Sequence, residues 1–211
     1  LDDDREKNAS LLSAADTPEV LKQKLDWPDR RWPWVDYGPL IQTAVQRGAA
    51  IAAGNLNRQM VSSLYGGDST ALGNDVRFET MDVLGAEERN TILDQLYESH
   101  CETMPREALG SMLTIQSARD AAMAHAMVAQ PAADRALLVA GGFHVRRDLG
   151  VPRHLEARDA DSNTSVLMMV EVDPQKLAAN EYEAATPTIA DYVRFTPATP
   201  ETDYCASLRG D

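Results

Sequence analysis

Apolar residues in this chain fall into long stretches with helical spacing and short stretches without alternation. The helical stretches, several with capping residues at their starts, predict helices over 17–25, 37–47, 86–101, 106–129 and 152–158. The short apolar runs predict buried strands at 49–56, 136–141 and 165–172. Because helices and strands alternate, we predict an α/β fold whose mixed or mainly parallel sheet is flanked by helices.

The order of these elements indicates one domain with a smaller helical part. We predict a single α/β domain over 1–211, a helical subdomain at about 84–130, and a Pro-rich C-terminal tail at about 173–211 packed over the domain. The only apolar patch of that tail lies at 192–195. Acidic residues typical of a first helical turn follow Leu1 at once, so we expect the domain to be N-terminally incomplete.

The net charge of the chain indicates which classes of ligand and macromolecule it can bind. The chain has a formal net charge of −13 at pH 7 and a pI of about 4.7. A surface of this sign repels nucleic acid and anionic lipid, so we predict no nucleic-acid partner. An anionic small ligand would need a local basic cluster, and the adjacent Arg146 and Arg147 are the obvious candidate.

His144 is the residue with the clearest candidate chemistry. The apolar run before it breaks at Gly141 and Gly142, which is typical of a buried strand that enters a tight turn. His144 would then lie at the carboxyl edge of the sheet, where open α/β folds bind their ligands. A structural histidine is the alternative, but the position at the end of a strand favours function.

The helix predicted over 106–129 carries a polar set at spacings of three and four. The members share one face with a methionine: Gln116, Arg119, Asp120 and Met123. We interpret this face as the solvated side of a long helix, and the methionines of the helix as core residues.

Six segments of the chain match a known family in order and spacing. They are Trp27–Pro33, Gly54–Leu56, Glu98–Cys101, Gln116–Met123, Gly142–Pro152 and Asp191–Pro197. In these segments the chain resembles the ChaN-like haem-binding uptake lipoproteins of Gram-negative bacteria, over nearly all of its length. The His-Val-Arg-Arg-Asp and Ser-His-Cys segments are the specific ones.

The resemblance implies a haem-binding protein that takes part in haem and iron uptake and is regulated by iron. It also implies a location on the periplasmic side of the outer membrane, with a lipid anchor in a segment upstream of Leu1. An upstream strand with a Gly-Glu-x-His motif belongs to the same family pattern. The partners to expect are haem, an outer-membrane haem receptor and a second copy of the chain.

Haem needs an apolar slot, an axial donor to iron, and cations for its propionates. Under the resemblance, the candidate donors to iron are His144, His100, His125, His154, Tyr37 and the methionines. His125 is a weak candidate, and we expect His154 to cap or line the short helix at 152–158. Tyr37 follows a tryptophan cluster, and a tyrosinate suits ferric haem, although a packing tyrosine is an equal alternative. Arg146 and Arg147 are the candidates for the propionates, with ordinary salt bridges as the alternative.

A hydrolase is the second function class. The wider group around this family contains Tiki-type proteases and erythromycin-esterase-like hydrolases, in which His and Glu perform metal-assisted or general-base chemistry. Here His144 would act with His100, Glu98 and an upstream Glu or His. The chain has no His-Glu-x-x-His, no Gly-x-Ser-x-Gly and no zinc-spaced cysteine pair, which weakens this reading.

Two cysteines, Cys101 and Cys205, permit one disulfide and by themselves say little about compartment. The resemblance places the chain in the oxidising periplasm and therefore predicts a disulfide that pins the tail to the rest of the domain. Two free thiols are the alternative, and a haem or zinc site at His100 and Cys101 is a third.

Overall fold

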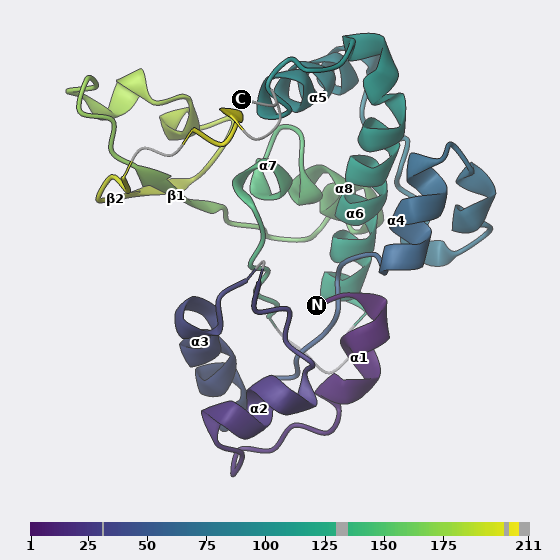
Figure 1. The fold of residues 1–211 in the computed structure, drawn as a ribbon, viewed down its shortest axis with the longest axis vertical. Helices are drawn as coiled ribbons and strands as arrows, with labels where there is room; N and C mark the ends of the chain where they lie inside the picture. Colours follow the sequence, from purple (N-terminus) through teal and green to yellow (C-terminus); the bar gives the residue numbers. More distant parts are fainter. Residues whose placement is uncertain (31, 130–134, 201–202, 207–211) are drawn as a thin grey trace. The chain divides into compact units, whose positions relative to one another are not determined.

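The computed structural model describes residues 1–30, 32–129, 135–200 and 203–206, and Figure 1 shows it as a ribbon. The chain divides into two compact units, Leu1–Arg58 and Gln59–Asp211. Each unit is described by itself. None of the helices in the described ranges is long and apolar enough to cross a membrane.

The described residues of the first unit form the helices α1 (Asp3–Ala9), α2 (Pro18–Lys24) and α3 (Trp34–Gln46). Helix α2 begins where the sequence predicts, because the Thr17 hydroxyl accepts a hydrogen bond from the Val20 amide and Pro18 occupies the first turn. Helix α3 begins at Trp34, three residues before the predicted start. The buried side chains of this unit include Leu21 and Leu25.

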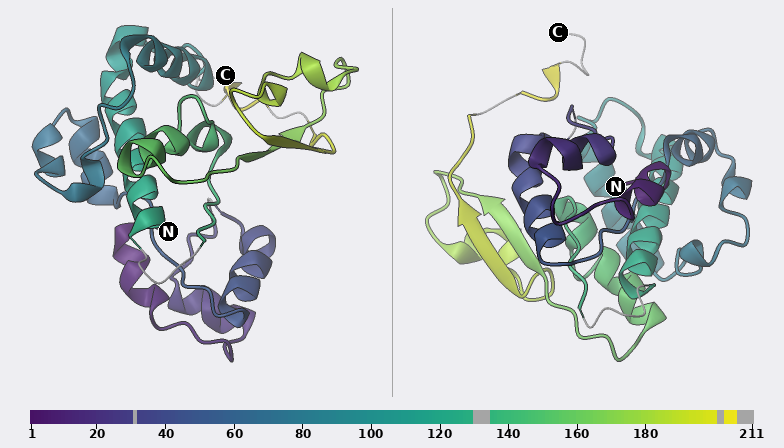
Figure 2. Two further views of the ribbon diagram at one scale, coloured as in Figure 1. Left: turned by 180° about the vertical axis from the view of Figure 1, so that it is seen from behind. Right: turned by 90° about the horizontal axis from the view of Figure 1, so that it is seen from below.

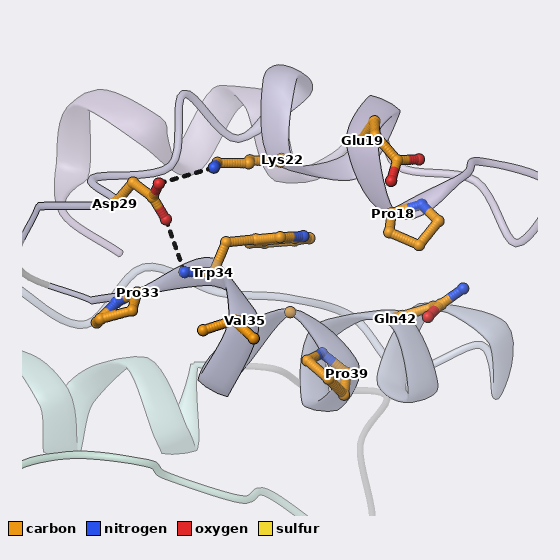
Figure 3. Close-up of a pocket in the computed structure, with 10 residues that line it drawn as sticks. Pro18, Glu19, Lys22, Asp29, Pro33, Trp34, Val35, Pro39 and Gln42 are labelled. Atoms are coloured by element: carbon orange, nitrogen blue, oxygen red, sulfur yellow. Dashed lines mark hydrogen bonds and ion pairs between the residues drawn. The ribbon is translucent and has the colours of Figure 1, made fainter.

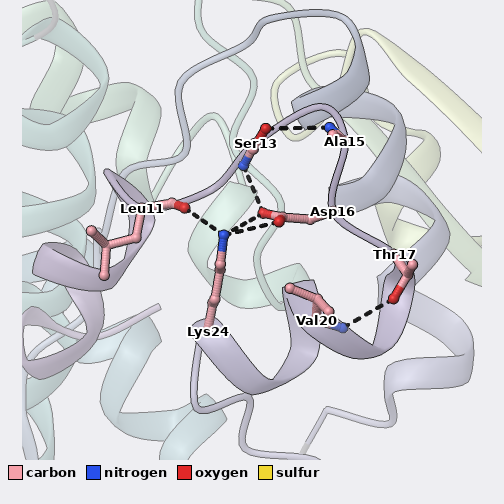
Figure 4. Close-up of polar contacts among 7 residues, drawn as sticks. All are labelled: Leu11, Ser13, Ala15, Asp16, Thr17, Val20 and Lys24. Atoms are coloured by element: carbon pink, nitrogen blue, oxygen red, sulfur yellow. Dashed lines mark hydrogen bonds and ion pairs between the residues drawn. The ribbon is translucent and has the colours of Figure 1, made fainter.

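Lys24 holds the loop between α1 and α2 in place (Figure 4). Its Nζ atom donates to the Leu11 carbonyl at 2.8 Å and to both carboxylate oxygens of Asp16 at 2.8 and 2.9 Å. The Ser13 amide donates to the same carboxylate at 2.7 Å. These bonds satisfy loop groups that no helix or sheet can pair.

The strand predicted at 49–56 does not form. The pairing found there is an isolated bridge between Asp2 and Asn55, and the amides of Gly54 and Asn55 donate to the Leu1 carbonyl. The apolar run correctly indicates burial at Ala53 and Leu56. A strand also needs a hydrogen-bonded neighbour, however, and an apolar run cannot specify one.

The second unit is built around one long helix, α6 (Gly110–Val128). Helices α5 (Ala86–Ser99) and α8 (Val151–Arg158) pack against it (Figure 1). Alanines along the contact are fully buried and let neighbouring backbones approach closely: Ala118, Ala121 and Ala124. The remaining helices are α4 (Arg58–Tyr65) and α7 (Gly142–Val145), with short 3-10 turns η1 (Ser69–Leu72), η2 (Val76–Phe78), η3 (Arg106–Leu109), η4 (Ala179–Glu181) and η5 (Glu183–Ala185).

Two strands, β1 (Leu167–Glu171) and β2 (Tyr192–Thr196), form a parallel sheet in which Leu167 lies opposite Tyr192. The right-hand view of Figure 2 shows them side by side. The α/β class is confirmed, and so is the strand predicted at 165–172. Strand β2 lies in the segment predicted as a tail, where β-branched and aromatic residues favour a strand.

The prediction of a strand at 136–141 is wrong. In the described residues this segment has no regular secondary structure and is paired with no strand. Leu137 is 80% exposed and Val139 is 48% exposed, whereas a strand in a parallel sheet would bury both of its faces.

A disulfide joins Cys101, just after α5, to Cys205, with the two Cα atoms 5.6 Å apart. The predicted bridge is therefore confirmed. It spans a sequence separation of 104 residues and ties the C-terminal segment to the helical part of the second unit.

Removing the disulfide should destabilise the second unit strongly. The chain-entropy model gives about 4–5 kcal/mol for a loop of this length, because the crosslink restricts the unfolded chain. The double variant Cys101→Ser/Cys205→Ser should therefore unfold at lower temperature and lower urea concentration. Calorimetry with and without reductant checks this, and reductant should leave the double variant unchanged. Equal melting temperatures for oxidised and reduced wild type would contradict the prediction.

His154 on α8 is completely buried. Its Nδ1 atom lies 3.1 Å from the Thr80 hydroxyl, while Nε2 has no hydrogen-bond partner within the part of the chain that is described. Burial, followed by the nearby charge of Arg158, lowers the pKa of His154 to about 4. The imidazole is therefore neutral in the folded protein at neutral pH.

This burial predicts a loss of stability in weak acid. Between pH 6.5 and 4 the unfolded chain binds a proton at His154 that the folded chain does not, so the free energy of unfolding falls as pH falls. The total loss should approach about 3 kcal/mol, at about 1.4 kcal/mol per pH unit. Urea unfolding from pH 7 to 4.5 measures the slope. The His154→Leu variant should show a flatter profile, and an unchanged slope would refute the assignment.

Candidate functional site

His144 lies on α7, a helix of four residues that begins at Gly142 directly after Gly141. Its amide donates to the Gly141 carbonyl at 3.0 Å. The chain then passes through Arg146 to Gly150, whose amide donates to the Arg146 carbonyl at 2.9 Å, and α8 begins at Val151. The histidine is therefore carried by a short helix between two glycine-containing turns.

The backbone of Gly150 approaches the backbone of His144 too closely for any side chain. A Cβ atom at Gly150 would lie 2.2 Å from the His144 carbonyl oxygen and 3.0 Å from that of Arg146. Only glycine permits this approach, which fixes the position of α7 against the start of α8.

A buried carboxylate holds the imidazole of His144. The Nδ1 atom lies 2.5 Å from Oδ1 of Asp120 on α6. The Gln116 amide nitrogen lies 3.1 Å from the same Nδ1 and donates to Asp120 Oδ2 at 3.5 Å. The Asp120 side chain is 1% exposed and that of His144 is 20% exposed, so the acid is hidden while the imidazole remains accessible.

Burial dominates the electrostatics of Asp120. It raises the pKa of this carboxyl, and the hydrogen bond and charge of His144, the charge of Arg119 and the amide of Gln116 oppose that rise. These opposing contacts from α6 and α7 are weaker than the effect of burial, so the pKa of Asp120 stays above its usual value.

This arrangement corrects the interpretation of the polar face on α6. Asp120 is buried and Gln116 is half-buried, so the face is not simply the solvated side of the helix. The spacing of four between these residues was the available signal, because it places them on one face. It could not show that His144 covers that face.

Arg146 is buried and already has carboxylate partners. Its guanidinium donates to Asp148 through two nitrogens, at 3.0 and 2.8 Å, and to Glu183 at 2.8 Å. Arg147 donates to the Asp191 carboxylate and, at 3.2 Å, to the Thr164 carbonyl. A propionate at either arginine would have to displace an internal carboxylate, so that role stays a prediction.

His100 lies elsewhere in the second unit, at the C-terminal end of α5. Its Nδ1 atom lies 2.8 Å from the Leu96 carbonyl oxygen and 3.3 Å from the Ser99 hydroxyl, and the next residue is the disulfide-bonded Cys101. The disulfide removes the thiol from the alternative His100–Cys101 ligand pair. The described residues contain no group of three or more His, Cys, Asp or Glu side chains that could hold a metal ion.

Tyr37 belongs to the first unit, on α3. Its ring centroid lies 4.9 Å from that of Trp32 and 6.3 Å from that of Trp27. Trp27 also meets Trp34 edge to face at 5.3 Å and donates its indole N–H to the Trp32 carbonyl. The predicted cluster of tryptophans around Tyr37 is therefore present, and the phenol is half-buried in it.

A cleft of about 540 Å³ opens in the first unit beside Trp34 (Figure 3). Asp29 shapes one side by accepting hydrogen bonds from Lys22 Nζ at 2.8 Å and from the Trp34 amide at 2.7 Å. The residues that line it are Pro18, Glu19, Lys22, Asp29, Pro33, Trp34, Val35, Gly38, Pro39 and Gln42. Tyr37 is not one of them, so this cleft does not place the phenol in contact with a ligand.

Of the five candidate residues, three lie on one segment of the second unit: His144, Arg146 and Arg147. His100 comes from another helix of that unit, and Tyr37 comes from the first unit. The partners missed by sequence reasoning are Asp120 and Gln116, which fix the imidazole of His144.

Comparison with known proteins adds to this geometry. A family model described as haem-binding uptake, Tiki superfamily, ChaN matches residues 4–155. The chain is also similar to a solved structure described as cofacial heme binding to ChaN of Campylobacter jejuni, with 24% identity and a TM-score of 0.62. That match covers 89% of this chain but 64% of the other, so the chain spans less than two thirds of that relative. No curated protein matches the sequence.

The close approach at Gly150 predicts that Gly150→Ala displaces α7. The added Cβ would overlap the His144 carbonyl, so we expect a destabilisation of about 1–3 kcal/mol and altered His144 ring resonances. Thermal unfolding and the NMR spectrum of the imidazole measure the two effects. Gly110→Ala is the matched control, since a Cβ there meets nothing within 4 Å. A Gly150→Ala variant that matches the control in both measurements would contradict the prediction.

Proposed function

Because the chain belongs to the ChaN family of haem-binding uptake proteins in the Tiki superfamily, we propose that it binds haem. The family match over residues 4–155 carries this proposal, and it includes the segments of Tyr37, His100 and His144. The resemblance inferred from the sequence motifs is confirmed by the same match.

The chemistry around His144 fits an iron porphyrin. An imidazole is an axial ligand that haem iron accepts, and a porphyrin face needs apolar surface around that ligand. Phe143 is 52% exposed directly beside His144, and the segment that leads to it exposes Leu137 and Val139. These exposed apolar side chains lie within seven residues of the accessible imidazole in the sequence, which supports this segment as the haem-contacting one.

Tyr37 is the second candidate ligand. Its half-buried phenol lies among tryptophan rings, which offer flat apolar faces for a porphyrin. When bound, haem would supply an iron that accepts a ligand from a side chain. The role of this chain is then to bind that iron through one side chain and to cover the apolar ring.

We further propose that the protein acts in haem and iron uptake on the periplasmic side of the outer membrane, under iron regulation. The family supports uptake, and the Cys101–Cys205 disulfide is consistent with an oxidising compartment. A lipid anchor upstream of Leu1, an outer-membrane haem receptor and a second copy of the chain complete this proposal. Their support is the family resemblance.

Titration with ferric haem tests the proposal. We expect a saturable, shifted Soret band, and we expect either His144→Ala or Tyr37→Phe to weaken binding at least tenfold, because the axial ligand is lost. His100→Ala tests the third donor. Tyr65→Phe is a matched control for Tyr37→Phe, since Tyr65 is an exposed tyrosine outside the candidate site.

A linear, non-saturating spectral response from the folded wild type would contradict haem binding. The hydrolytic alternative would then be the next to test, by measuring ester and peptide turnover with and without chelator.

A further inference from the structure

One face of the β1–β2 sheet is open to solvent. The register places Leu167 beside Tyr192. Two residues further along, it places Met169 beside Arg194, so the four side chains lie on the same face. Leu167 is 53% exposed, Met169 is 69% exposed and Tyr192 is 65% exposed. Arg194 is exposed as well. Together these four residues form the open face.

The opposite face of the sheet is packed against neighbours. The ring of Phe195 lies against that of Tyr182, with the two centroids 4.8 Å apart. Met168 lies beside α7, where a Cβ atom on Gly142 would be 3.6 Å from the methionine methyl carbon. Parallel sheets are normally covered on both faces. Exposed apolar side chains gathered on one face are therefore typical of a surface that binds a ligand or a partner.

Arg194 gives the open face a positive charge in a chain whose net charge is −13. Within the described residues, no carboxylate pairs with its guanidinium, whereas Arg146 and Arg147 already have internal carboxylate partners. Strand geometry places Arg194 about 5 Å from Met169 across the sheet and about 7 Å from Tyr192 along β2. A ligand on this face would thus meet apolar side chains and an unpaired cation together.

We propose that the open face is a porphyrin-binding surface, separate from the candidate axial ligands His144 and Tyr37. This inference rests on the proposed haem function. A porphyrin is a flat apolar ring with carboxylates on one edge, so it needs an apolar surface and a cation beside it. The thioether of Met169 packs well against an aromatic ring, and the guanidinium of Arg194 suits a propionate.

Charge favours this ligand over a second copy of the chain at the open face. Two copies that each have a net charge of −13 repel one another. A porphyrin is small enough for the local charge of Arg194 to act on its propionates, because charges beyond the Debye length of about 8 Å are largely screened by physiological salt. The open face therefore fits a small anionic ring better than an acidic protein.

Titration with metal-free protoporphyrin IX, followed by its fluorescence, is the direct test. This ring has no iron, so its binding needs no axial ligand and reports the surface alone. We expect saturable binding that Met169→Glu weakens at least tenfold, because the variant removes apolar contact and repels the propionates. Leu177→Glu is the matched control, since it makes the same change at a residue that is 92% exposed and lies outside the open face.

The dimethyl ester of the same porphyrin tests Arg194. Arg194→Gln should weaken binding of the free acid about fivefold, as expected for an exposed ion pair, and should leave binding of the ester unchanged. Arg47→Gln is the control for the change in net charge, because Arg47 is an exposed arginine of the first unit. His144→Ala and Tyr37→Phe should leave binding of the metal-free ring unchanged.

Each outcome decides one of the two proposals. A folded Met169→Glu protein with wild-type affinity for protoporphyrin IX would overturn the role of the open face, even if ferric haem binds through His144 or Tyr37. So would sedimentation showing a wild-type dimer that Met169→Glu dissociates without any loss of porphyrin affinity, because a second copy would then cover the face. If the metal-free ring binds as expected but ferric haem gives no shifted Soret band, the haem function fails while the porphyrin surface stands.

Discussion

The burial of α6 is the constraint on which the second unit depends. One helix packs against both α5 and α8, and its fully buried alanines allow this because they keep the backbones close. The same buried face carries Asp120. A buried carboxyl group needs hydrogen-bond partners, and burial raises the pKa of Asp120, so His144 and Gln116 lie where the packing of α6 places a polar group.

The segment that carries His144 is restrained from several directions. The close approach at Gly150 positions its backbone, and the ion pairs of Arg146 connect it to Glu183 on η5. Arg147 connects it to Asp191, which also accepts a hydrogen bond from the Val166 amide beside β1. The two arginines therefore join the histidine segment to the sheet and its connection, which explains their presence without a ligand.

The functional proposal combines a family match with this local geometry. The family supports haem, and the structure supplies an imidazole with a buried acid on one nitrogen and exposed apolar residues beside it. An acid behind a histidine suits a metal ligand and a general base equally well, so the pair by itself does not choose between a haem carrier and a hydrolase. The family match, rather than the pair of Asp120 and His144, is the reason to favour haem binding over hydrolysis.

Local chemistry in the sequence was sufficient for most helices, for β1 and for the choice of His144 as a candidate residue. Periodicity, the Thr17–Pro18 cap and the glycine turn act between neighbours in the chain, so the sequence states them directly. The disulfide was predicted from the family resemblance, which implies the oxidising periplasm. The sequence by itself therefore determined the α/β class, the main helices and the candidate imidazole.

Only the tertiary structure decided which groups meet. Asp120 and His144 are 24 residues apart, and Arg146 and Glu183 are 37 apart, so no local pattern records their contacts. Residues 136–141 and 49–56 have the composition of strands, but a strand exists only where another backbone pairs with it. The physical reason is the same in each case. Burial and pairing depend on which segments meet in the folded chain, whereas a residue type only limits the environments and partners that suit it.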